Sequence, residues 1–421
     1  MKLQPVITCT ITASIALAAP QPLPAPWEPV HHHHHHHHHH RPLLLTPDLI
    51  AFHKNITEIE SITGHEESIG EWLVSSLESQ GYRVERQYVQ RDPARFNVVA
   101  WAGKKSADTK VLLSGHIDTV PPFLPYKHSH TTTNKTISGR GSVDDKGSVA
   151  AQIIAVNNLL SAGTVDPDDV ALLYVVGEET GGDGMRAAND LNLTPQSIIF
   201  GEPTEGKLVT GHKGNLGGTI RVKGRAAHSG YPWLGRSANE MLVQALFALM
   251  ELGKSLPESD KYGVTTINIG KIEGGVAANV VAEDASASLA IRIAEGTPDF
   301  IRGKITQAIH DAVAEFLEGE EKPEDVVAIE WSARGYAPID IDHDVPGFDT
   351  ITVNYGTDIP NLKRTVEGQK RYLYGPGTIL VAHSDHEMLT EEQLFDAVKG
   401  YEKILLHALG GEPCDECKQD L

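Results

Sequence analysis

A chain of 421 residues is long enough to bury a large hydrophobic core, and its length predicts two domains. Hydrophobic residues make up 40% of the chain and charged residues 22%, which is the balance of a globular protein rather than of a disordered one. The formal net charge of −20 argues against nucleic acid and against an anionic membrane as partners, because both repel an acidic surface.

The N-terminus has the pattern of a secretory signal peptide. Lys2 is the only charged residue before Glu28, residues 6–19 are apolar or small, and Ala16-Leu17-Ala18 offers a cleavage site. The apolar run is too short to span a membrane, and no later segment has about 20 consecutive apolar residues. We therefore expect residues 1–19 to be a signal peptide and the protein to be secreted, with no membrane partner.

A Pro- and His-rich leader is expected at residues 20–44. Its ten consecutive histidines, residues 31–40, are either an affinity tag or a natural tract. A homopolymer has no fixed geometry, so the tract is not a catalytic site.

The cysteines and glycosylation motifs fit a secreted protein. Cys9 lies in the signal peptide, whereas Cys414 and Cys417 form a Cys-x-x-Cys motif in the tail. A disulfide there suits an oxidising compartment, and an inert tail fits equally well. The sequons at Asn55 and Asn134 predict a glycoprotein.

Apolar strands alternate with helices over the first half of the chain. The pattern predicts helices at 47–63, 67–81 and 144–162, and strands at 82–89, 96–102, 111–114, 171–176 and 197–200. This alternation is typical of an α/β fold with a mainly parallel sheet flanked by helices. We expect it to form the first part of a catalytic domain, residues 45–211.

From about residue 212 the pattern changes. It predicts a strand at 217–223, a helix at 236–255, strands at 264–272 and 283–293, a helix at 297–317 and a strand at 326–333. The order β-α-β-β-α-β is ferredoxin-like. We expect residues 212–335 to be an inserted domain. Residues 336–421 then return to the catalytic domain and end with a helix at 390–408.

Polar motifs follow the predicted strands, where open α/β sheets bind their ligands. They are Ser114-Gly-His116-Ile-Asp118, Gly141-Ser-Val-Asp144-Asp145, Gly177-Glu178-Glu179-Thr-Gly181, Gly201-Glu202-Pro203-Thr204 and, after the insertion, Ala382-His383-Ser-Asp-His386-Glu387. Burying unpaired carboxylates at the end of an apolar strand is costly, and a divalent metal ion would balance them. Two histidines with three or more carboxylates form a ligand set that suits zinc. The sequence has no Gly-x-Ser-x-Gly motif, so a serine hydrolase of that fold is not supported.

These five motifs, with the inserted domain, resemble the metallopeptidase family of carboxypeptidase G, aminoacylase, acetylornithine deacetylase and succinyl-diaminopimelate desuccinylase. The resemblance extends from about residue 45 to 408 and implies a zinc-exopeptidase-like fold with two zinc ions per subunit. Cobalt or manganese can share such ligands. His116 and Glu202 would bind one ion, Glu179 and His383 the other, and Asp144 would bridge both.

The resemblance also implies roles for residues that do not bind metal. Glu178 would be the general base, and Asp118 would orient the imidazole of His116. His383 is preferred over His386 because the family's last ligand lies four residues before a glutamate, here Glu387.

Three further residues of the inserted domain match the family's pattern. His228 would be the lid histidine that helps to hold the oxyanion, and in dimeric relatives it reaches the partner's site. Asn279 would bind substrate, and Arg292 would bind the substrate carboxylate through its guanidinium fork. The resemblance allows a homodimer formed through the lid domain, whereas in a monomer His228 would have to act from its own chain.

These residues predict a secreted di-zinc metallohydrolase that cleaves an amide bond beside a free carboxylate. Secretion favours a carboxypeptidase that releases C-terminal amino acids from peptides. The alternative is an N-acyl-amino-acid amidohydrolase, which would use the same metals and base. A third reading, a catalytically silent metal-binding protein, predicts the loss of a ligand or of Glu178, and all of them are present.

Overall fold

The computed structural model describes residues 46–130 and 135–411 of the chain. The expected signal peptide, the leader with its ten histidines, Asn134 and the two tail cysteines all lie outside these described residues. Within them, no helix is both long and apolar enough to cross a membrane.

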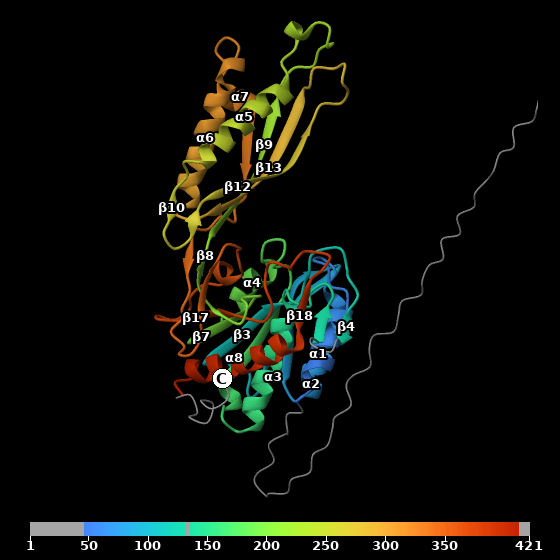
Figure 1. Cartoon of the computed structure of the whole chain (residues 1–421), viewed down its shortest axis with the longest axis vertical. Helices are drawn as coiled ribbons and strands as arrows, with labels where there is room; N and C mark the ends of the chain where they lie inside the picture. Colours follow the sequence, from blue (N-terminus) through green and yellow to red (C-terminus); the bar gives the residue numbers. More distant parts are fainter. Residues whose placement is uncertain (1–45, 131–134, 412–421) are drawn as a thin grey trace, which may run out of the picture.

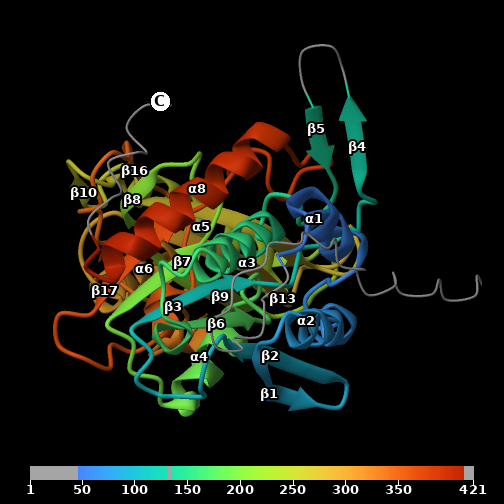
Figure 2. The ribbon, with the colours of Figure 1, turned by 90° about the horizontal axis from the view of Figure 1, so that it is seen from below.

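A six-stranded main sheet forms the centre of the larger part of the molecule (Figures 1 and 2). In spatial order its strands are β1 (Arg83–Arg91), β2 (Ala94–Trp101), β6 (Val170–Val175), β3 (Val111–His116), β7 (Ser197–Gly201) and β17 (Lys370–Tyr374). The last four run parallel, and β1 and β2 form an antiparallel hairpin at one edge. Every residue of β3, β6 and β7 is buried, as expected of parallel strands covered on both faces.

The two faces of the main sheet bury separate apolar clusters, because successive side chains of a strand point to opposite sides. Leu113 and Leu172 belong to one cluster, and Leu112 and Leu173 to the other. The first face is covered by helices α1 (Leu49–Glu58), α2 (Glu67–Ser79), α3 (Lys146–Ser161) and α8 (Glu391–Ala408), as Figure 2 shows. The second face is covered by α4 (Asp183–Ala188) and by a small sheet.

Several short strands were absent from the sequence prediction. The small sheet on the second face has the order β15 (Ile339–Asp340), β8 (Leu208–His212), β16 (Thr350–Val353), and another has the order β18 (Met388–Thr390), β5 (Lys135–Ser138), β4 (Lys127–His130). A further pair joins β10 (Glu258–Ser259) to β11 (Gly263–Val264). Most of these strands have four residues or fewer, too few to show an apolar alternation.

The inserted unit is a four-stranded antiparallel sheet with two long helices and one short helix. Its sheet order is β12 (Thr266–Gly274), β13 (Asp284–Ile293), β9 (Gly214–Lys223), β14 (Val327–Trp331), and its helices are α5 (Ala238–Gly253), α6 (Pro298–Val313) and the short α7 (Pro323–Val326). Ser237 and Thr297 cap α5 and α6 with their side-chain oxygens, and Pro298 occupies the first turn of α6. The chain order β9-α5-β12-β13-α6-β14 confirms the predicted ferredoxin-like arrangement.

The strand register gives the inserted sheet a near end and a far end. On β13, Ile293 pairs with Gly214, the first residue of β9, and Asp284 pairs with Lys223, the last. Because β9 leaves from β8 beside the main sheet, Ile293 and Arg292 lie at the near end (Figure 1). The loops 224–236 and 275–283 lie at the far end, roughly 25 Å away along the strand.

Candidate metal centre

Five of the predicted metal ligands come together at the carboxyl ends of three neighbouring strands. His116 ends β3, Glu179 follows β6 and Glu202 follows β7, and the sheet order places these strands side by side. Ligand atoms of His116, Asp144 and Glu202 lie within 4.8 Å of one another, and so do those of Asp144, Glu179 and His383. The two groups share Asp144, which is the arrangement expected of two metal sites with one bridging carboxylate.

Asp144 stands between the two histidines. Its Oδ1 lies 3.0 Å from His116 Nε2, and its Oδ2 lies 3.2 Å from His383 Nε2. His383 Nε2 is also 3.0 Å from Glu179 Oε2. His116 and Asp144 are buried whereas His383 is exposed, so the centre opens to solvent on the His383 side.

A buried ion pair supports the loop that carries Asp144. The carboxylate of Glu387 accepts hydrogen bonds from the backbone N–H groups of Val143 and Asp144, at 2.9 and 3.2 Å. Its second oxygen pairs with the Arg140 guanidinium at 2.7 Å. Sequence reasoning used Glu387 only to locate His383, and no spacing rule linked it to a residue more than 240 positions away.

Asp118 holds the turn that carries the predicted base. Its carboxylate accepts the backbone N–H of Glu178 at 3.0 Å, the N–H of Glu179 at 3.2 Å and the hydroxyl of Thr63 at 2.7 Å. The imidazole Nδ1 of His116 lies 3.0 Å from the backbone oxygen of Asp118 and 3.5 Å from the carboxylate. Both the backbone oxygen and the carboxylate of Asp118 thus lie near the imidazole of His116 that Asp118 is predicted to orient. The hydrogen bonds of Asp118 to the Glu178–Glu179 turn were not predicted.

The electrostatics of the centre favour a bound cation. Burial raises the pKa values of Glu179 and Glu202, and repulsion by Asp144 and neighbouring carboxylates raises them further. Burial alone would lower the pKa of His116, but hydrogen bonds with Asp118 and Asp144 raise it well above its usual range. A divalent ion would supply the positive charge that these groups otherwise obtain from protons. The donor set of imidazoles and carboxylates therefore fits the two zinc ions that the sequence implies.

Glu178 faces a pocket beside the centre. Burial raises its pKa well above the usual range, with His116 opposing the rise and Asp358, Glu179 and Asp144 adding to it. The pocket is lined by Gly115, His116, Glu178, Gly201, Glu202 and Asp358, among others.

Asp358 is a buried carboxyl of this pocket that sequence reasoning missed. Burial raises its pKa to about 6, and its Oδ1 accepts a hydrogen bond from Asn361 at 2.9 Å. It lies in an irregular segment after the insertion, where no periodicity marks a strand end.

Asp145 and His386, which stand next to predicted ligands in the sequence motifs, lie outside both groups. Asp145 is fully buried, and its Oδ2 lies so close to Gly115 and Gly201 that a Cβ at either glycine would collide with it. Burial raises the pKa of Asp145 to about 8. His386 is exposed, and its Nδ1 lies 2.9 Å from Asp385.

Arg292 lies on the side of the inserted unit that faces the centre. Its guanidinium stands beside Gly356 and the hydroxyl of Tyr336. Burial raises the pKa of Tyr336, Arg292 opposes that rise, and Glu178 and Glu202 add to it. The Tyr336 hydroxyl and the Arg292 guanidinium thus meet at Gly356, and both the cation and the carboxylates of the centre influence the pKa of Tyr336.

His228 and Asn279 lie at the far end of the inserted sheet. Both are exposed, His228 pairs with Val280, and the N–H of Ser229 donates to the backbone oxygen of Asn279 at 3.0 Å. Within one chain, the structure brings these two residues close to each other but not to the metal centre.

Two family models match separate parts of the chain. A model described as "Peptidase dimerisation domain" matches residues 210–320, and one described as "Peptidase family M28" matches residues 97–196. The first covers most of the inserted unit, and the second covers strands of the main sheet together with Asp144 and Glu179.

Curated relatives match most of the chain. A protein of Aspergillus terreus named "Probable carboxypeptidase" is 47% identical over 86% of this chain and 86% of its own length. Another of that name, from Arthroderma otae, is 44% identical over 88% of each chain. A third, from Neosartorya fischeri, is 43% identical over 97% of this chain and 99% of its own.

Solved structures share the fold at low sequence identity. A tripeptidase from Staphylococcus aureus aligns with a TM-score of 0.70 and 20% identity, covering 87% of this chain and 99% of its own. An M20 family metallo-carboxypeptidase from Sulfolobus solfataricus aligns with a TM-score of 0.64 and 16% identity, covering 86% and 100%. Together with the curated relatives, these likenesses show that the chain belongs to the M20 family of metallopeptidases and is a peptidase.

Proposed function

We propose that this protein is a secreted two-zinc carboxypeptidase that releases C-terminal amino acids from peptides. The observation that carries the proposal is the pair of ligand groups that share Asp144, with Glu178 beside them and Arg292 on the facing side. The name of the fungal relatives, "Probable carboxypeptidase", supports the peptide substrate and the C-terminal direction of cleavage.

His116 and Glu202 would hold one zinc ion, Glu179 and His383 the other, and Asp144 both. When bound, the ions would act as Lewis acids that polarise the scissile carbonyl and make water a stronger nucleophile. Glu178 takes the proton of the attacking water and returns it to the leaving amine. Asp118 keeps Glu178 in place through its hydrogen bonds to the backbone of the turn.

Arg292 would select substrates with a free C-terminal carboxylate. A guanidinium presents two parallel N–H groups to a carboxylate, and this geometry distinguishes it from a neutral amide. The proximity of Arg292 to Gly356, which precedes the pocket residues Thr357 and Asp358, supports this role.

The deciding experiment measures amino-acid release from N-blocked dipeptides and from matched N-acetyl amino acids by the zinc-loaded protein. Faster cleavage of the dipeptides supports a carboxypeptidase, whereas preference for the acetylated amino acids supports the N-acyl-amino-acid amidohydrolase. Chelator treatment should abolish release, and Glu178→Gln should slow it about 10²–10⁴-fold, the contribution of a general base. Activity that survived both would refute the mechanism.

Secretion is the part of the proposal that rests on residues 1–19 alone. We expect the protein to accumulate in the culture medium and its N-terminal sequence to lack these residues. Protein that stays in the cells with residue 2 intact would contradict it.

A homodimer is the last part of the proposal. The inserted unit matches the family model described as "Peptidase dimerisation domain", and it places His228 and Asn279 far from their own chain's metal centre. In a dimer these residues would reach the centre of the partner.

A further inference from the structure

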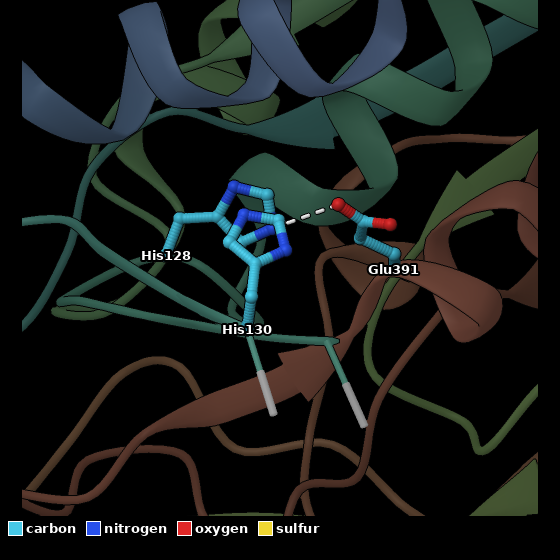
Figure 3. Close-up of side chains that lie close together, drawn as sticks. All are labelled: His128, His130 and Glu391. Atoms are coloured by element: carbon cyan, nitrogen blue, oxygen red, sulfur yellow. Dashed lines mark ion pairs between the residues drawn. The ribbon is translucent and has the colours of Figure 1, made fainter. Parts of the chain in front are cut away.

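A second set of metal-binding side chains lies apart from the centre at Asp144. His128 and His130 are on β4, and Glu391 is the first residue of α8. One ligand atom from each lies within 4.8 Å of the other two. Figure 3 shows the two imidazoles and the carboxylate pointing toward one another.

The fold fixes all three side chains on one face of a small sheet. His128 and His130 are two residues apart on a strand, so they point to the same side. His128 pairs with Ile137 of β5, and Ile137 pairs with Leu389 of β18, two residues before Glu391. A reciprocal capping box between Thr390 and Gln393 fixes the start of α8, and with it the backbone of Glu391.

The three side chains lie close together, with His128 and Glu391 partly buried and His130 exposed. His128 Nε2 lies 2.7 Å from Glu391 Oε1, and the two imidazole rings are 4.1 Å apart between centroids. The Nε2 atom of His128 is shielded from solvent and has no hydrogen bond of good geometry, despite the nearby carboxylate. Both His128 and Glu391 are largely covered, with side chains 21% and 13% exposed.

The simpler alternative is an ion-pair network, because Lys135 Nζ also lies 3.0 Å from Glu391 Oε2. That network needs one histidine at most, and it gives no reason for a second imidazole tilted against the first. Two imidazole nitrogens and one carboxylate oxygen this close together can share one cation. The contact of Lys135 is with Oε2, whereas Oε1 is the carboxylate oxygen that faces His128.

We propose that His128, His130 and Glu391 bind a zinc ion, with water in the fourth position, and that this ion clips the β4–β5 hairpin to the start of α8. Two imidazole nitrogens and one carboxylate oxygen suit zinc better than calcium or magnesium, which prefer oxygen ligands. The clip would act close to the support of Asp144, because Glu387 lies four residues before Glu391. The site is independent of the proposed peptidase reaction.

The test counts the zinc ions bound by full-length chains after dialysis against buffered free zinc. All chains carry the same replacement of histidines 31–40 by glycine and serine, because a histidine tract binds metal itself. His128→Gln and His130→Gln should each bind one ion fewer than the parent chain. The matched control, His310→Gln on α6, should bind as many as the parent.

The zinc affinity of a further variant, Lys135→Gln, distinguishes a metal site from an ion-pair network. Lys135→Gln should bind the extra ion several-fold more tightly, because it removes a competing cation from Glu391. Loss of one ligand should weaken binding by more than about tenfold, since even outer contacts of metal ligands contribute 10- to 100-fold. Equal zinc content in the parent chain, His128→Gln and His130→Gln would overturn the proposal.

A crystal of the unaltered protein grown with zinc provides a test that needs no variant. Anomalous difference maps on either side of the zinc absorption edge should show a peak between His128, His130 and Glu391. Peaks at the Asp144 centre but none here would refute the clip and leave the proposed peptidase intact. A peak between His128, His130 and Glu391 but none at the Asp144 centre would support the clip and contradict the proposed two-zinc peptidase.

Discussion

At the scale of a single residue, Arg292 is the side chain best suited to select the substrate. Its guanidinium lies beside Gly356, which precedes the pocket residues Thr357 and Asp358. No acidic partner of Arg292 is recorded in the described part of the chain, although Arg221 on β9 of the same sheet pairs with Glu330 at 2.8 Å. A guanidinium without a carboxylate of its own chain is suited to a carboxylate of the substrate.

We expect Arg292→Ala to lower kcat/KM about 10–100-fold for peptides with a free C-terminus, the equivalent of one charge-assisted hydrogen-bonded pair. Peptides with an amidated C-terminus should be cleaved by the variant and the parent at similar, low rates. Arg221→Ala serves as the matched control and should leave both rates unchanged. If Arg292→Ala slowed both substrates equally, Arg292 would be structural rather than selective.

His53 predicts how stability depends on pH. Its imidazole is fully buried in α1, and its Nε2 donates to the backbone oxygen of Ser142 at 2.9 Å. Burial lowers its pKa from 6.5 to about 4, with Lys146 and His128 adding to the fall and the Ser142 bond opposing it. The pKa of His53 is lower in the folded protein than in the unfolded chain. The neutral, buried imidazole of His53 therefore contributes its full stability above pH 6.5, and this contribution is lost as the pH falls toward 4.

The loss should reach about 3 kcal/mol of unfolding free energy, since each unit of pKa shift corresponds to about 1.4 kcal/mol. We expect Tm to fall more between neutral pH and pH ~4.5 in the parent than in His53→Gln, whose amide can still donate to Ser142 but does not titrate. Chelated samples remove acid-induced release of metal from the comparison. Parallel Tm curves for the two proteins would mean that His53 contributes nothing to acid sensitivity.

At the scale of elements, α5 has two apolar faces. Its inner face is buried against the inserted sheet, while Val243, Phe247 and Met250 on the outer face are about 60% exposed. Their spacing of four and three residues places them on one stripe. The neighbouring β12 is an edge strand that exposes Ile272. An exposed apolar stripe beside an open sheet edge is typical of a subunit interface.

We therefore expect Phe247→Glu to convert a dimer into monomers, because it places a charge at the centre of the stripe. Light scattering of the purified protein measures the mass directly. Phe395→Glu, on the exposed side of α8, is the matched control and should leave the mass unchanged. A dimer that persisted in Phe247→Glu would exclude α5 as the interface.

Metal ligands at the ends of buried strands could be predicted from the sequence, whereas residues in short strands and irregular segments could not. The ligands at His116, Glu179 and Glu202 follow buried parallel strands, whose unbroken apolar runs end abruptly in polar residues. The site at His128 and His130 carries no such signal, because Lys127-His-Ser-His130 has no apolar alternation. Asp358 and Tyr336 were missed because they lie in irregular segments whose position depends on tertiary packing.

At the scale of the whole molecule, the predicted catalytic residues occupy two distant regions of one chain. Glu178 lies at the metal centre, and His228 lies at the far end of a sheet that projects from it (Figure 1). If His228 touches substrate in this arrangement, it does so at the site of another copy of the chain. The activity of mixed dimers can therefore test whether His228 acts at the partner's site.

We expect two inactive variants, His228→Ala and Glu178→Gln, to restore activity to each other when they are co-expressed. In a mixed dimer one site combines an intact Glu178 with the partner's intact His228, and the other site carries both changes. With equal amounts and random pairing, half of the dimers are mixed, so activity should return to about a quarter of the parent's. Co-expression of Glu178→Gln with Asp144→Asn, which alter the same site, should restore none. If the first pair stayed as inactive as this control, His228 would have to act from its own chain or not at all.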